Sequence, residues 1–389
     1  MNATQGMTTD RADVEAAGDT ARRFALEELA PHIHAWDEAG TFPRSVYQRA
    51  AQLGLIGMGF DESLGGSPAS MAMRNAVSMA LARHTASGGL LASLFSHTIG
   101  LPPLARPGSA ALQQRVIPPV LRGEKIAALA ITEPGGGSDV ASLRTTARRE
   151  GNAWLINGEK TFITSGMRAD WITVAVRTGE PGTRGAGGIS MIVVPGDAAG
   201  LQRTELKKMG WWCSDTAHLR FDGVRVPLDH LVGDEGAGFK YIMSNFNSER
   251  LGMAAMALGY AQACFDEALD WARERKTFGQ PLVGHQAVRH KLVDMRMRIE
   301  ATQAWVDAVT ARMDAGDEGP DWVAQVCMLK NQATQTMQFC ADQAVQILGG
   351  MGFMRGTRSE RIYREVKVMM IGGGAEEIMK ELAARQLGL

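Results

Sequence analysis

The sequence is poor in the residues that build disulfide-linked or metal-holding proteins. It has four cysteines in 389 residues, and none of them forms a C-x-x-C pair. Their spacing fits neither a zinc site nor a disulfide framework, and the eight histidines are scattered. We therefore expect no metal site and thiols that stay reduced inside a cell. The four are Cys213, Cys264, Cys327 and Cys340.

Long apolar runs and an excess of charge are also missing. No run approaches the ~18–20 apolar residues that cross a bilayer, and Met1 to Asp10 lack the apolar stretch of a signal peptide. The formal net charge is −1, so nothing favours nucleic acid or a membrane surface as a partner. These absences predict a cytoplasmic protein. The G-x-G-x-x-G fingerprint and the Walker P-loop are absent too, so a dinucleotide would have to bind in another way.

Three textures follow one another along the chain and predict three domains. Helical periodicity dominates residues 1–124, short strands between turns fill 125–234, and long helical stretches make up 235–389. The predicted class is mainly α with a β domain. An N-terminal helical domain would precede a small antiparallel β barrel or sandwich, and a C-terminal four-helix bundle would follow. The clearest predicted elements are strands at 154–156, 171–177, 188–194 and 218–226, and helices at 238–275, 285–313, 321–348 and 375–386.

The segment Ala130-Ile-Thr-Glu-Pro-Gly-Gly-Gly-Ser-Asp139 is the most informative stretch. Three consecutive glycines let the backbone approach a ligand closely, and free N–H groups in such a loop suit an anion. Thr132 and Ser138 add hydroxyl groups beside them. On glycine content alone, a plain surface turn is the simpler interpretation.

Three more segments each have an ordinary structural interpretation. Asn157-Gly-Glu-Lys-Thr-Phe-Ile-Thr-Ser-Gly166 opens with a hairpin-like turn. Arg275-Lys-Thr-Phe-Gly-Gln280 is typical of a helix end, with cations in the last turn and glycine beyond. Gln346-Ile-Leu-Gly-Gly-Met-Gly-Phe353 is typical of a glycine-capped helix.

Taken in order and spacing, the four segments resemble the signatures of the acyl-CoA dehydrogenase family, over nearly the whole chain. The resemblance implies FAD as the cofactor, an acyl-CoA thioester as the substrate and electron-transfer flavoprotein as the electron acceptor. It also implies a homotetramer or a homodimer. Arg275 would bind the FAD pyrophosphate of a neighbouring subunit, for which a fixed guanidinium fork is suited.

The resemblance also gives the family's flavin positions residue by residue. The first two segments would surround the flavin ring, and the last two would contact FAD from across a subunit interface. The implied positions are Leu129, Ala130, Ile131, Thr132, Gly137, Ser138, Phe162, Ile163, Thr164, Arg275, Thr277, Phe278, His285, Gln286, Gln346, Ile347, Gly349, Gly350, Ala375 and Glu377.

The catalytic base is missing from the place where most of the family carries it. Removing a proton next to a thioester carbonyl needs a base against that carbon. The loop before the last helix, Ile371-Gly-Gly-Gly-Ala-Glu-Glu-Ile378, has Gly373 at the usual position. The string Asn247-Ser-Glu-Arg-Leu251 instead resembles the isovaleryl-CoA and long-chain dehydrogenases, and so points to Glu249. An apolar helix face there would raise the pKa of this carboxyl group.

Other carboxylates and other functions compete with this interpretation. Glu376 and Glu377 suit the start of the last helix, where they complement its dipole, and the family does not use Glu133 as the base. A flavin oxidase or monooxygenase on the same scaffold, or an acyl-CoA-binding homologue without catalysis, are the alternatives.

The substrate contacts follow from the same resemblance. The backbone N–H of Gly373 would stabilise the charge that develops on the thioester oxygen. By family position Leu94 to Leu104 would line the far end of the acyl pocket, and both branched and straight acyl chains remain open. Residues implied to contact the substrate are Ser138, Phe246, Asn247 and Arg250.

Overall fold

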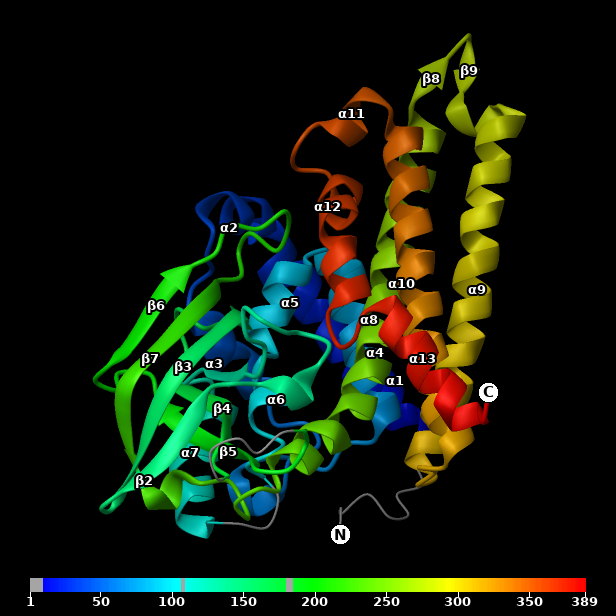
Figure 1. The fold of residues 1–389 in the computed structure, drawn as a ribbon. Helices are drawn as coiled ribbons and strands as arrows, with labels where there is room; N and C mark the ends of the chain where they lie inside the picture. Colours follow the sequence, from blue (N-terminus) through cyan, green and yellow to red (C-terminus); the bar gives the residue numbers. More distant parts are fainter. Residues whose placement is uncertain (1–9, 106–108, 180–184) are drawn as a thin grey trace.

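Helices form the first part of the chain in the computed structural model, which describes residues 10–105, 109–179 and 185–389 (Figure 1). The expectation for Met1 to Asp10 falls, apart from Asp10 itself, outside these residues. Asp10 caps the first helix, because its carboxylate accepts a hydrogen bond from the N–H of Ala12. The helices here are α1 (Arg11–Phe24), α2 (Ile33–Ala39), α3 (Ser45–Gln52), α4 (Met71–Thr85), α5 (Gly88–Leu94), α6 (His97–Gly100) and α7 (Ala110–Leu121), with a π-helical turn at Ala25–Leu29.

A curled seven-stranded sheet forms the middle part (Figure 1). Its path is β1-β4-β2-β3-β7-β6, and β5 pairs with β4 outside that path. Most pairs are antiparallel, but β4 pairs in parallel with β1, from Ala127 opposite Trp171 onward, and with β2 at Thr146 opposite Arg177. The strands are β1 (Ala127–Ala130), β2 (Thr146–Glu150), β3 (Ala153–Thr164), β4 (Trp171–Arg177), β5 (Ile189–Pro195), β6 (Leu201–Glu205) and β7 (Thr216–Pro227).

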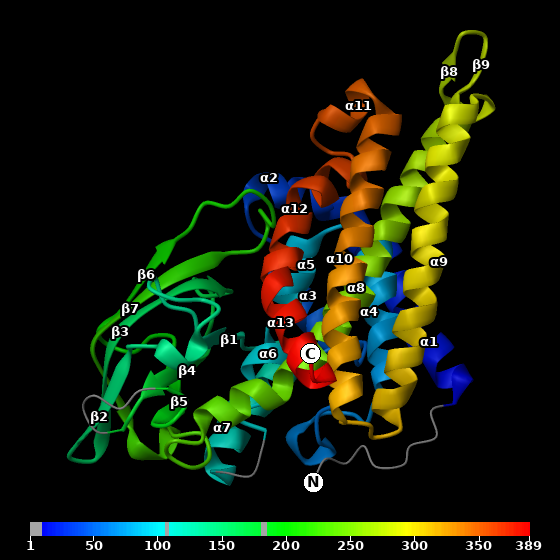
Figure 2. The same cartoon turned by 45° about the vertical axis from the view of Figure 1, so that its right-hand side comes forward.

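Long helices dominate the last part, where α8, α9 and α10 lie side by side in both ribbon views (Figure 2). The hairpin β8–β9 projects from the end where α8 leads into α9 (Figure 1). Pro320 stands in the first turn of α10, where its missing N–H costs no hydrogen bond. The elements are α8 (Gly238–Glu274), β8 (Lys276–Thr277), β9 (Gln280–Pro281), α9 (Gln286–Asp314), α10 (Pro320–Leu348), α11 (Gly350–Phe353), α12 (Arg358–Ile371) and α13 (Glu376–Leu387).

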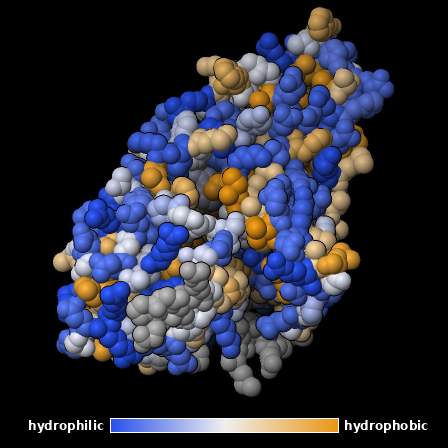
Figure 3. All heavy atoms as spheres, in the orientation of Figure 1, coloured by the Kyte–Doolittle hydropathy of each residue, from blue (hydrophilic) through white to orange (hydrophobic). Residues whose placement is uncertain are grey.

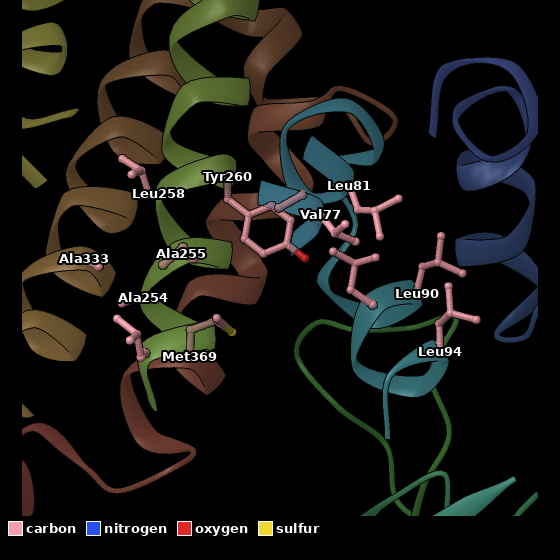
Figure 4. Close-up of a cluster of buried hydrophobic side chains, with 14 of the residues drawn as sticks. Val77, Leu81, Leu90, Leu94, Ala254, Ala255, Leu258, Tyr260, Ala333 and Met369 are labelled. Atoms are coloured by element: carbon pink, nitrogen blue, oxygen red, sulfur yellow. The ribbon is translucent and has the colours of Figure 1, made fainter. Parts of the chain in front are cut away.

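One hydrophobic core joins the two helical parts. Figure 4 shows Val77 of α4, Leu90 of α5, Leu258 of α8, Ala333 of α10 and Met369 of α12 around the same interior. The sheet has a second core of its own, which includes Trp154 and Phe221. Helices from both ends of the sequence thus hold α8 from several sides, and the sheet packs beside them.

The expected fold class is confirmed: a helical N-terminal part, a β part and a helical C-terminal part follow one another along the chain. The predicted long helices and the strand at 171–177 match within about one residue. The sequence interpretation did not include α12, nor the parallel pair of β1 and β4. All four cysteines are free and buried. Within the described residues, no helix is both long and apolar enough to span a membrane.

Candidate functional site

Glu249 lies in the N-terminal half of the long helix α8 and has no counter-ion close enough for a salt bridge among the described residues. Its Oε2 atom is shielded from solvent and accepts no hydrogen bond from any residue that the structure describes. Burial raises the pKa of Glu249 to about 7, although the charge of the neighbouring Arg250 acts in the opposite direction. A carboxylate in this setting is costly to keep ionised, and it is a ready proton acceptor near neutral pH.

Arg250 connects the residues expected to contact the substrate. Its Nε donates to the carbonyl oxygen of Gly373 at 3.0 Å, and its Nη1 donates to Oδ1 of Asn247 at 3.3 Å. The guanidinium also lies 5.2 Å from the ring centre of Phe246. The structure therefore brings Phe246, Asn247 and Arg250 together with Gly373. Of these, Arg250 directly follows Glu249 on α8.

The loop that lacks the usual base faces α8. Gly373 has a left-handed backbone, with φ of 68°, which favours glycine. A Cβ atom at this position would stand 2.7 Å from the sulfur of Met253, and Met253 lies one helical turn beyond Glu249. The position that carries the base in most of the family therefore adjoins the helix face that carries Glu249 here.

Ala375 and Glu377 lie at the start of α13, just after this loop. The rival carboxylate Glu376 accepts a hydrogen bond from Gln335 at 2.7 Å and, with Glu377, lies in the first turn of α13. Both therefore stand where carboxylates complement the helix dipole. The stretch Leu94 to Leu104 runs from the end of α5 past α6, and its leucines are buried.

The first glycine-rich segment follows β1 and is anchored through Glu133. This carboxylate accepts a hydrogen bond from the ammonium of Lys160 at 2.8 Å. It also accepts hydrogen bonds from the backbone N–H groups of Arg144 and Thr145, at 2.6 and 2.8 Å. Burial alone would raise the pKa of Glu133, but the charge of Lys160 and these hydrogen bonds leave it below its ordinary value. Glu133 thus holds the loop in place, and nothing in its surroundings suits it to act as a base.

The first and second segments lie side by side. The N–H of Thr161 donates to the carbonyl of Thr132 at 2.8 Å, and the ammonium of Lys160 donates to the carbonyl of Ile131, also at 2.8 Å. Ile163 is buried, whereas Phe162 is 70% exposed and has a left-handed φ of 61°. Leu129 to Thr132 and Phe162 to Thr164 thus form one neighbourhood, with Gly137 and Ser138 exposed at its edge.

The third and fourth segments lie elsewhere, at the far end of the bundle (Figure 1). Thr277 and Gln280 contact the imidazole of His285 at 3.3 and 3.2 Å, and the ring of Phe278 meets that imidazole edge-on. Gln346 to Gly350 lie where α10 ends and α11 begins, near the same end in both ribbon views.

The two groups of flavin positions are far apart in one chain. Glu249 and Arg275 are 26 residues apart along α8, and a helix rises 1.5 Å per residue, so the separation is about 39 Å. Residues near Glu249 and residues near Arg275 therefore lie in two separate regions of the chain.

The exposed residues around the glycine-rich loop fit a flavin ring. The exposed ring of Phe162, beside the glycine-rich loop, offers an apolar surface for a planar ring system. The N–H groups of Gly137 and Ser138 make no hydrogen bond within the described residues and are free to donate to a ligand. Figure 3 shows the surface hollowed near its centre, with apolar side chains at the rim. A bound flavin ring would lie against the segment from Leu129 to Ser138 and against Phe162.

Two buried lysines were not singled out in the sequence. Lys160 and Lys330 are both fully buried, and each donates to backbone carbonyls of a loop at the site. A weak signal was present for Lys330, because it directly follows the apolar run Val326 to Leu329 and a lysine is costly to bury without a partner. Its partners on α12 and in the following loop are distant in sequence, and α12 itself was not predicted.

Three family models match the chain along its length. They describe the N-terminal domain of acyl-CoA dehydrogenase at residues 11–124, its middle domain at 128–224 and its C-terminal domain at 236–388. The chain is 36% identical to the cyclohexane-1-carbonyl-CoA dehydrogenase of Geobacter metallireducens, and the match covers 96% of this chain and 97% of that protein.

Two further relatives agree. The mitochondrial long-chain specific acyl-CoA dehydrogenase of Mus musculus is 35% identical, over 95% of this chain and 85% of that protein. The crystal structure of an acyl-CoA dehydrogenase from Geobacillus kaustophilus superposes with a TM-score of 0.92 at 33% identity, covering 98% of this chain and 100% of that one. The chain therefore belongs to the acyl-CoA dehydrogenase family, whose members are flavoprotein oxidoreductases.

Proposed function

We propose that this protein uses FAD to convert an acyl-CoA thioester to the trans-2-enoyl-CoA, with Glu249 as the base. The observation that carries the assignment is the buried Oε2 atom of Glu249, which accepts no hydrogen bond in the described part of the chain. The raised pKa of that carboxyl group is appropriate for taking a weakly acidic C–H proton. Glu133 and Glu376, in contrast, are occupied by hydrogen bonds.

In the proposed reaction, one proton and one hydride leave the acyl chain and a carbon–carbon double bond forms. FAD, when bound, supplies the acceptor for the hydride from the β-carbon. The carboxylate of Glu249 takes the proton from the α-carbon. The N–H of Gly373, which makes no hydrogen bond within the described residues, would donate to the thioester oxygen as charge develops there. Arg250, Asn247 and Phe246 would hold the CoA portion.

The assignment predicts that Glu249→Gln keeps bound FAD but is not bleached by acyl-CoA under anaerobic conditions. Losing a general base typically lowers the rate by roughly 10²–10⁴-fold. The matched control is Glu376→Gln, which removes a nearby carboxylate and should be bleached at nearly the wild-type rate. Bleaching by the Glu249→Gln variant at an undiminished rate would refute the base assignment. The measurement is stopped-flow absorbance with a panel of branched and straight acyl-CoAs.

The same preparation separates a dehydrogenase from an oxidase. We propose electron-transfer flavoprotein as the acceptor, as the family resemblance implies. Reduction of an electron-transfer dye should then exceed hydrogen peroxide output at saturating acyl-CoA. Peroxide formed in equal amount to the enoyl product would instead assign an oxidase.

We further propose a homo-oligomer, a tetramer or a dimer, in which the far end of one bundle completes the FAD site of a neighbour. Two observations support this proposal. The flavin positions within one chain lie about 39 Å apart along α8, and large apolar side chains stand open at that end, Phe278 at 97% and Phe353 at 86% exposure. Light scattering of Phe278→Asp against the wild type should show a smaller species that retains less FAD.

A further inference from the structure

Lys330, on α10, is a buried lysine whose ammonium is held by backbone carbonyls. Its side chain is fully buried, and it makes no salt bridge within the described residues. The ammonium instead donates to two backbone carbonyl oxygens, of Met370 at 3.0 Å and of Gly374 at 2.8 Å. Burial lowers the pKa of Lys330 to about 8, with the charge of Glu376 acting to raise it.

The two carbonyls flank the loop that contains Gly373. Met370 lies in the last turn of α12, where a cation also complements the negative end of the helix dipole. Gly374 lies on the other side of the loop. Between them, the carbonyl of Gly373 accepts a hydrogen bond from Nε of Arg250 at 3.0 Å. Two cations from two helices, α10 and α8, thus hold two carbonyls of one short loop and one in the helix turn that leads into it.

This loop needs an external support, because its own residues provide little. Gly373 and Gly374 both have positive φ, of 68° and 114°, and glycine has the largest backbone freedom to lose. An apolar residue in place of Lys330 would avoid the cost of burying an ammonium. The retained charge therefore indicates a task in shaping the loop.

We infer that Lys330 is a positioning residue for the thioester site. It fixes the loop around Gly373 so that the N–H of Gly373 reaches the thioester oxygen. This inference rests on the proposed dehydrogenation. An oxyanion donor must stand about 2.7–3.1 Å from the oxygen it stabilises, and a misplacement of about 1 Å can cost on the order of 100-fold in rate. Lys330 acts only through the loop and does not itself touch the substrate.

The first test is the kinetics of Lys330→Met in the FAD-bound enzyme. We expect kcat to fall by about 100-fold while KM for acyl-CoA changes little, because a donor used in the transition state is displaced. The matched control is Asn331→Ala. It removes the neighbouring side chain on α10, which donates to the carbonyl of Glu376 at 3.0 Å and not to the Gly373 loop. The control should keep its kcat within about threefold.

The second test reads the donor directly. In the Glu249→Gln background the bound acyl-CoA stays unreacted, so the infrared stretch of its thioester carbonyl reports hydrogen bonds to that oxygen. Adding Lys330→Met should move the stretch back toward its value in water, and adding Asn331→Ala should not. An unchanged stretch together with an unchanged kcat would overturn the inference.

The outcomes separate the two proposals. If Glu249→Gln is still bleached, the base assignment fails, and the kinetics of Lys330→Met still decide the role of Lys330. If Lys330→Met does not fold with FAD, Lys330→Gln, which keeps one donor, takes its place and should show an intermediate loss of kcat. Failure of both variants to fold would assign Lys330 to stability alone and reject the positioning role.

Discussion

Two glutamates, one in the loop after β1 and one on α8, have opposite surroundings. Glu133, in the glycine-rich loop after β1, accepts three hydrogen bonds and pairs with a buried lysine. Glu249, on α8, has a shielded oxygen with no hydrogen-bond partner among residues 10–105, 109–179 and 185–389. The pKa of the first is lowered and that of the second is raised to about 7. The same side chain is an anchor where its charge is satisfied and a proton acceptor where it is not.

The largest effect should come from breaking the anchor. Lys160→Met leaves the largely buried carboxylate of Glu133 without its cation, and removing one partner of a buried pair costs about 3–5 kcal/mol. We expect the urea midpoint to fall clearly and FAD to bind more weakly, because the glycine-rich loop loses its support. Equilibrium unfolding at fixed protein concentration provides the measurement.

The double variant Lys160→Met with Glu133→Gln is the control for this prediction. Because it leaves no unpaired charge, it should recover part of the lost stability. A double variant no more stable than Lys160→Met alone would show that the ion pair does not anchor the loop.

A smaller effect, of opposite sign, should follow at the unsatisfied carboxylate. Between the ordinary pKa of a glutamate, 4.5, and about 7, the folded protein keeps a proton on Glu249 that the unfolded chain has lost. Stability therefore falls as pH rises through this window. Glu249→Gln lacks this penalty and should be more stable than wild type at pH 8, by on the order of 3 kcal/mol.

This stability difference should vanish near pH 4.5. Melting temperatures of both proteins, recorded at several pH values with FAD in excess, provide the measurement. Equal melting temperatures at pH 8 would show that ionising Glu249 does not lower the stability of the folded protein.

The smallest effect concerns the rate. Only the ionised form of Glu249 accepts a proton, so kcat/KM should rise about tenfold per pH unit below pH 7 and level off above it. The FAD content, measured at each pH, excludes cofactor loss as the cause of the decline. A profile that breaks near pH 4.5 would place the reaction on a carboxylate with an ordinary pKa.

The sequence predicted the elements whose signals are local. The helix at Gly238–Glu274 and the strand at Trp171–Arg177 were found because apolar spacing and glycine punctuation lie within each segment. The pairing of β1 with β4 was missed, because it joins strands about 40 residues apart. The helix α12 was missed because its charged residues obscure an apolar spacing. Two of them, Arg361 and Glu365, are buried in the folded chain, where they pair with Asp37 and with the N–H of Gly88.

The candidate site divides in the same way. The glutamate at position 249 could be named from a short string and from the vacancy at Gly373, and the structure adds its burial. Lys330 could not be assigned, because its bonds reach carbonyls 40 and 44 residues further along the chain. Side-chain identity predicts chemistry, whereas the partner of a buried charge is a property of the folded chain.

The length of α8 sets a limit on how this sequence can change over evolutionary time. The helix carries Glu249 near one end and leads into the β8–β9 hairpin at the other. One inserted residue would turn the hairpin by about 100° and move it 1.5 Å relative to Glu249. Substitutions can accumulate along the 26 residues between Glu249 and the hairpin. Insertions and deletions there should be eliminated by selection, so the length of this segment should stay constant while its sequence changes.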